Sequence, residues 1–93
     1  PERKAIDNFL YTISPKYSVA ATNNLGSHLS QRKIIYTIPV GLGKTDYVLF
    51  LLSPSPNPAF KTQIEMIKRL SVDKNYIQVA SIGDFVAFRK INL

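Results

Sequence analysis

The chain has 93 residues, with 12 basic and 6 acidic side chains for a net charge of +6, one histidine and no cysteine. This length is typical of one small domain with a modest core, so we expect a single domain over residues 1–93. The lack of cysteine excludes disulfide frameworks, thiol catalysis and thiolate zinc sites. The longest apolar run, residues 47–52, is far shorter than the roughly 18 residues that a membrane-spanning helix needs.

Hydrophobic spacing and turn residues predict eight elements. In chain order they are a helix over 6–13, a strand over 17–22, a short helix over 25–31 capped by Asn23 and Asn24, strands over 34–38 and 46–52, a helix with Asn57 as N-cap and Pro58 at its first position, and strands over 76–82 and 85–91. Both long helices show the i, i+3, i+4 spacing of one apolar face. The run 46–52 is almost continuously apolar, which is typical of a strand buried on both faces.

The order α-β-α-β-β-α-β-β predicts a small Rossmann-like layered α/β domain. The first two strands and their helix should form a right-handed parallel unit. Seven residues, 39–45, join the second and third strands, enough for a parallel return, and an antiparallel pairing stays open. We expect the sheet order 2-1-3, followed by the terminal antiparallel hairpin beside strand three. Gly83-Asp84 favours a type II′ turn in that hairpin.

The string Gly41-Leu42-Gly43-Lys44-Thr45 ends like a phosphate-binding P-loop. The full pattern needs a glycine at position 38, which is Ile38, and a helix directly after the Lys-Thr pair. Because a strand is predicted there instead, the string is interpreted as a glycine turn.

The second candidate site follows the first strand. Backbone amides after Asn23 and Asn24 could hold an anion at the carboxyl end of that strand. His28 and Arg32 are four residues apart, so on a helix both could reach a phosphate or carboxylate. Alternatively, they anchor the helix through backbone carbonyls or Asp46. A lone histidine with scattered carboxylates predicts no metal site.

The charged and aromatic residues give no catalytic set. The basic surplus divides equally, +3 in residues 1–46 and +3 in 47–93, which is typical of a solvated surface rather than a nucleic-acid patch. Asp7 and Glu65 are expected on solvated helix faces and Asp84 in a turn, with no carboxylate pair placed for acid/base work. The five tyrosines could form a stacking platform, although core positions with an exposed hydroxyl are the simpler interpretation. No cofactor is predicted, and enzymatic activity stays open.

Four stretches resemble one protein family. They are residues 17–23, the pattern His28-Leu29-Ser30-x-Arg32, Ile35-Tyr36-x-Ile38-Pro39, and residues 46–49. They are similar to the C-terminal soluble part of predicted multi-pass membrane proteins of unknown function, whose layout resembles that of membrane-embedded glycosyltransferases using lipid-linked sugar donors. The resemblance covers residues 15 to 52. It marks Asn23, His28, Arg32 and Tyr36 as a structural signature or a contact site.

The resemblance implies a location and a class of partner. The chain would be a non-catalytic accessory domain on the extracytoplasmic face of the cytoplasmic membrane, attached to the rest of its parent protein and binding a glycan or a lipid-phosphate acceptor. The only methionine is Met66 and the chain begins at Pro1, so we expect it to be part of a longer polypeptide. The alternative is a free-standing basic α/β domain that binds nucleic acid.

Overall fold

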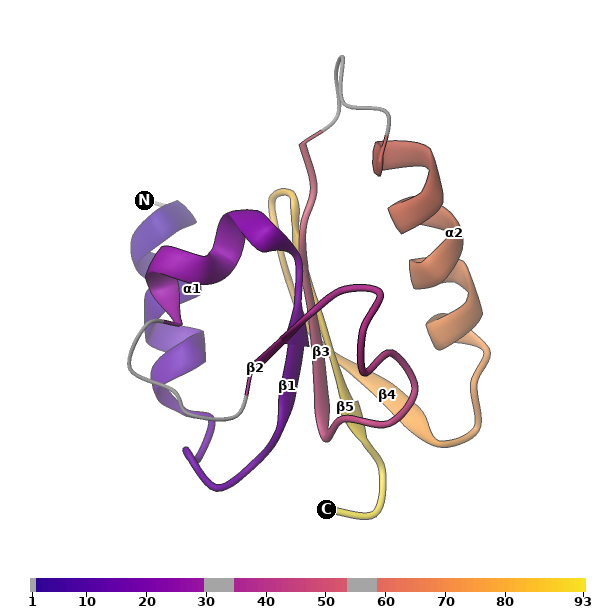
Figure 1. The fold of residues 1–93 in the computed structure, drawn as a ribbon. Helices are drawn as coiled ribbons and strands as arrows, with labels where there is room; N and C mark the ends of the chain where they lie inside the picture. Colours follow the sequence, from indigo (N-terminus) through magenta and orange to yellow (C-terminus); the bar gives the residue numbers. More distant parts are fainter. Residues whose placement is uncertain (1, 30–34, 54–58) are drawn as a thin grey trace.

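The computed structural model of the chain describes residues 2–29, 35–53 and 59–93 (Figure 1). In chain order the elements are α1 (Glu2–Tyr11), β1 (Val19–Ala21), the 3-10 helix η1 (Asn23–His28), β2 (Ile35–Thr37), β3 (Tyr47–Leu51), α2 (Ala59–Ser71), β4 (Tyr76–Ile82) and β5 (Phe85–Lys90). The predicted α/β class is confirmed. The predicted capping residues Asn57 and Pro58 lie outside the described residues, as does Arg32.

The strands form one mixed sheet in the order β2-β1-β3-β5-β4. β1 pairs in parallel with β2 and with β3, so that Ala20 lies between Tyr36 and Val48. β5 is antiparallel to both β3 and β4. β1 and β3 are therefore interior strands, and residues 19–21 and 48–50 are all buried. This burial on both faces explains why their sequences are apolar without alternation.

Helical layers cover both faces of the sheet, with α1 and η1 on one side and α2 on the other (Figure 1). Side chains alternate between the two faces along each strand. The core on the α1 side joins Ile6 and Leu10 of α1 to Val19, Leu49 and Phe85 of the sheet. The core on the α2 side joins Leu70 of α2 to Val48, Phe50, Tyr76 and Phe88. The sheet thus separates two cores.

The short helix after β1 differs from the predicted helix over 25–31. It is a 3-10 helix that begins at Asn23, and Thr22 rather than an asparagine is its N-cap, without a side-chain capping bond. Asn24 is used elsewhere, because its Nδ2 donates to the carbonyl of Leu51 at 2.8 Å and its Oδ1 accepts from Thr22 Oγ1 at 2.7 Å. The asparagine that was expected to cap a helix instead joins the carboxyl ends of β1 and β3.

The Gly41–Thr45 segment is a turn, as the sequence predicts. Gly41 and Gly43 have φ of 79° and 81°, a left-handed conformation that glycine adopts without steric cost. The amide of Thr45 donates to the carbonyl of Gly41 at 3.1 Å, and the carbonyl of Thr45 accepts from the Tyr76 hydroxyl at 2.6 Å. Burial, together with Asp73 and Asp46, raises the pKa of Tyr76. The turn is therefore fixed to the α2-side core.

The terminal hairpin also follows its sequence. Gly83 has φ of 56° and no described non-glycine residue, Asp84 included, has a positive φ. These signs fit a type II′ turn and exclude type I′, which needs positive φ at both central residues. A register shift between Gln78 and Ala80 interrupts the pairing of β4 with β5.

Candidate binding groove

Asp7 and His28 meet where α1 and η1 pack together. Nδ1 of His28 lies 2.6 Å from Oδ1 of Asp7, and the two side chains are 11% and 49% exposed. Asp7 directly follows the buried Ile6 and stands three residues before the buried Leu10, so it borders the buried face of α1, and its carboxylate reaches across to η1. The imidazole is largely buried while one side of the carboxylate stays in solvent. The Asp7–His28 contact is thus a side-chain pair at the surface that joins α1 to η1. It is not an ion pair within the core.

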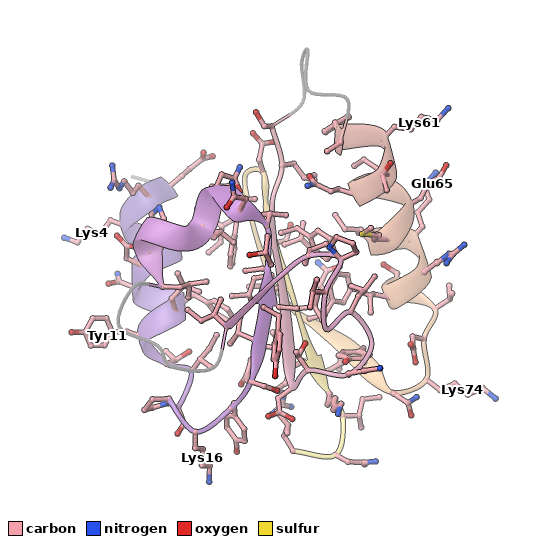
Figure 2. All side chains as sticks on the ribbon, viewed as in Figure 1. Lys4, Tyr11, Lys16, Lys61, Glu65 and Lys74 are labelled. Atoms are coloured by element: carbon pink, nitrogen blue, oxygen red, sulfur yellow. The ribbon has the colours of Figure 1, made fainter. Side chains whose placement is uncertain are left out.

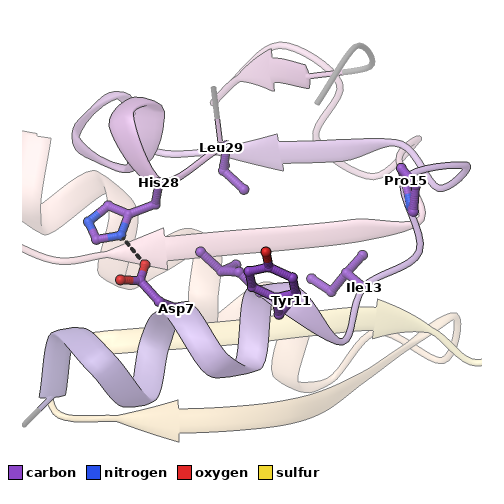
Figure 3. A pocket seen from close by; sticks show the side chains of 7 residues that line it. Asp7, Tyr11, Ile13, Pro15, His28 and Leu29 are labelled. Carbon is purple, nitrogen blue, oxygen red and sulfur yellow. Dashed lines mark hydrogen bonds and ion pairs between the residues drawn. The ribbon is translucent and has the colours of Figure 1, made fainter. Parts of the chain in front are cut away.

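A groove of about 510 Å³ lies beside the Asp7–His28 pair (Figure 3). Its walls come from α1, the segment after it, and the end of η1. The lining residues are Asp7, Leu10, Tyr11, Ile13, Pro15, His28 and Leu29. Figure 3 shows Asp7 and Tyr11 along α1, with His28 and Leu29 across from them. Tyr11 is 93% exposed, so almost its whole ring is available to a ligand.

His28 was expected to reach an anion or to anchor its helix through backbone carbonyls or Asp46, and the structure places it against Asp7 instead. Asp46 is paired with Ser18: its Oδ2 accepts from the amide of Ser18 at 3.0 Å, and its amide donates to Ser18 Oγ at 3.0 Å. Asp7, which was expected on a solvated helix face, is half exposed and also contacts His28. The α1–η1 packing brings together two residues 21 positions apart, which no local spacing could indicate.

The asparagines form a separate feature at the carboxyl end of β1. Asn24 is engaged with Thr22 and Leu51, and the amide of Leu25 donates to the carbonyl of Thr22 at 3.0 Å. The side chain of Asn23 is exposed. The amide of Leu25, which the predicted anion site would use, is therefore already hydrogen-bonded within the turn. Asn24 has a structural role, because its side chain bonds to Thr22 and Leu51.

Tyr36 lies on the opposite face of the sheet from the groove. It is level with Ala20 and Val48 in register, and Val48 belongs to the α2-side core. Tyr36 is 42% exposed. The structure therefore separates Tyr36 from His28, and the five residues predicted from sequence do not form one site. Arg32 lies outside the described residues.

Sequence reasoning missed Asp7 and Tyr11 as groove residues. The available signal was their separation of four positions, which places them on one side of a helix. That side is next to the apolar stripe, so both residues border the packing partner of α1. The partner itself, η1, could not be identified from local sequence.

The arrangement offers hydrogen bonding and ring stacking rather than a recognisable catalytic set. Among residues 2–29, 35–53 and 59–93, no group of three histidine or carboxylate side chains is placed to hold a metal ion. Asp7 retains a second carboxylate oxygen, and the imidazole retains Nε2. Together with the Tyr11 ring, these groups can contact a ligand that combines hydroxyl groups with an apolar surface.

Comparisons with known proteins gave no relative: no family model, curated protein or solved structure matched the chain. In the described parts of the chain, neither helix is long and apolar enough to cross a bilayer.

Proposed function

We propose that this chain is an accessory binding domain whose groove between α1 and η1 takes a glycan. The observation that carries the proposal is the nearly fully exposed ring of Tyr11 in a groove that also holds the Asp7–His28 pair. A sugar ring presents an apolar C–H face and a rim of hydroxyl groups. The tyrosine ring suits that face, and the carboxylate and imidazole suit the hydroxyls.

Charge favours a neutral glycan over a lipid phosphate at this groove. The described lining contains one carboxylate, one imidazole and no lysine or arginine. A phosphate monoester would bring its negative charge towards Asp7, which is unfavourable at contact distances. A neutral sugar hydroxyl can donate to the same carboxylate without that cost.

We further propose the cellular context that the family resemblance implies. In this proposal the domain belongs to a polytopic membrane protein similar in layout to membrane-embedded glycosyltransferases, has a Rossmann-like layered fold, and lies on the extracytoplasmic side. Its remaining partner is then the rest of the parent protein. A reporter fused at the position of this domain in the full-length protein tests the context: extracytoplasmic reporter activity supports it, and cytoplasmic activity contradicts it.

The binding proposal is tested by titrating the isotope-labelled domain with methyl glycosides of glucose, galactose, mannose and arabinose, and separately with dodecyl phosphate. Amide shifts in ¹H–¹⁵N spectra should concentrate at Asp7, Tyr11, His28 and Leu29 with at least one glycoside. Tyr11→Ala should abolish them without loss of fold, because that side chain is 93% exposed. Tyr36→Ala, a tyrosine on the other face, is the matched control and should leave the shifts intact.

Two results would overturn the glycan assignment. No shift at the groove with any glycoside at millimolar concentration would exclude this ligand class. Shifts with dodecyl phosphate alone would assign the groove to a lipid-phosphate ligand instead.

The alternative, a nucleic-acid-binding domain, has less support. Figure 2 shows Lys4, Lys16, Lys61 and Lys74 directed outward from separate parts of the molecule, whereas nucleic-acid binding relies on a basic patch or stripe. A salt-sensitive titration with single- or double-stranded DNA or RNA would favour the alternative.

A further inference from the structure

The β4 edge of the sheet has few of the features that protect an exposed strand from pairing. β4 is the outermost strand and the longest, and none of its seven residues is charged, proline or glycine. Ile77 and Val79 are 49% and 36% exposed. Natural edge strands are commonly blunted by lysine, proline or short length, because their unpaired amides and carbonyls accept another strand. The one such feature in β4 is the register shift between Gln78 and Ala80, because a β-bulge also protects an edge.

The opposite edge is less suited to pairing. In the described part of the chain β2 covers three residues, Ile35–Thr37, so it offers few main-chain groups there to a partner strand. An added strand would find more than twice this length at β4. Because β4 is the longer of the two edge strands, it is the better surface for an added strand.

We propose that β4 pairs antiparallel with β4 of a second copy of this chain, so that the two sheets become continuous across a two-fold axis. The chain carries a net charge of +6, which makes most close approaches between copies unfavourable. β4 is uncharged along its whole length. Two copies can therefore meet there without bringing like charges together, and self-pairing of identical strands satisfies the same main-chain groups on both sides.

Charges at the two ends of β4 are complementary in this arrangement. Lys74 lies two residues before the strand and Asp84 two residues after it, and both are exposed. Figure 2 shows Lys74 directed away from the body of the domain. An antiparallel register centred on Val79 brings the turn that holds Lys74 to the end of the strand pair where the Gly83-Asp84 turn of the second copy lies, and the two-fold axis repeats this approach. Opposite charges that approach at the two ends of the strand pair attract one another.

Sedimentation analysis of the 93-residue chain over about 1–500 μM tests the proposal, with a concentration-dependent dimer expected. Val79→Lys puts two like charges directly opposite one another at the axis and should weaken dimerisation by at least about tenfold. Val40→Lys is the matched control, since Val40 is 60% exposed in the turn after β2, the strand at the opposite edge of the sheet. Circular dichroism establishes that both variants fold.

A charge exchange tests the register. Lys74→Asp and Asp84→Lys should each weaken the dimer several-fold, and the double variant should restore it. A chain that is monomeric throughout the concentration range overturns the proposal and indicates that the register shift protects the edge. A dimer that Val79→Lys leaves unchanged overturns it as well, because the contact then lies elsewhere. A dimer sensitive to Val79→Lys but not restored by the charge exchange overturns the register centred on Val79.

Discussion

The two layers that cover the sheet close it in different ways. On the α2 side one helix of 13 residues and the turn after β2 pack over large buried side chains, including an edge-to-face pair of Phe50 and Phe88 at 6.3 Å. On the α1 side the cover consists of two shorter elements, of 10 and 6 residues, joined at the surface by Asp7 and His28. A groove lies beside that join.

The difference indicates where a small domain can keep a ligand site without weakening its core. A seam between two short elements leaves polar groups and an aromatic ring at the surface, while the apolar residues beneath remain buried. We therefore expect changes on the α2 side to affect mainly the free energy of unfolding. Changes along the α1–η1 seam should affect binding, or the join itself, at smaller energetic cost.

The largest effect is expected for Phe88→Ala. Phe88 is fully buried, and truncating a buried phenylalanine costs about 3–5 kcal/mol, a large part of the stability of a domain this small. Urea denaturation measures the loss. Phe9→Ala makes the same change on the other side, where the ring is only partly buried and packs 5.7 Å from Phe85. We expect a smaller loss there because less apolar surface is removed from the core, and an equal or larger loss would contradict the comparison.

A smaller loss is expected for His28→Ala, which removes the Nδ1 contact to Asp7 at 2.6 Å and empties a largely buried position. We expect about 1.5 kcal/mol, the lower end of the range for a hydrogen bond to a charged group, because the Asp7 side chain is 49% exposed. The measurement is the melting temperature together with the glycoside titration. We predict a greater effect on stability than on binding; an unchanged melting temperature with lost ligand response would reverse this assignment.

Asn24→Ala should cost about 1 kcal/mol, because it removes the bonds to Leu51 and Thr22 that join two strand ends. Asn23→Ala is the adjacent control: its side chain is exposed, so we expect almost no change. Chemical denaturation of both variants measures the difference. Equal losses would show that the asparagines share one role.

A loss of similar size at neutral pH is expected for Tyr76→Phe, about 1 kcal/mol from the lost bond to the carbonyl of Thr45. The variant also has a pH signature. The folded pKa of Tyr76 is raised, so the folded state holds its proton longer than the unfolded state, and stability falls as pH rises above the ordinary tyrosine value of about 10. Chemical denaturation between pH 8 and about 11 should show that the free energy of unfolding falls with pH in the unsubstituted chain. The fall should be weaker in Tyr76→Phe.

The fold was largely accessible from sequence because its strongest signals are local. Continuous apolar runs marked the interior strands, and Gly83-Asp84 marked the hairpin. The site was less accessible, because it depends on packing between distant segments. Asp7 meets His28 only after α1 and η1 dock, and Tyr36 is removed from the groove by strand alternation. Asn24 has the residue type and position of a helix cap, but its side chain bonds to the carbonyl of Leu51, a contact between distant segments that local sequence does not indicate.

The central claim, that the α1–η1 seam binds a glycan through Tyr11, is tested most directly by intermolecular nuclear Overhauser effects. The domain is observed with the glycoside that produces the largest shifts, and contacts from the sugar ring protons to tyrosine rings are recorded. We predict contacts to the Tyr11 ring and none to the Tyr36 ring. Contacts to Tyr36 with none to Tyr11 would place the ligand on the other face and contradict the account.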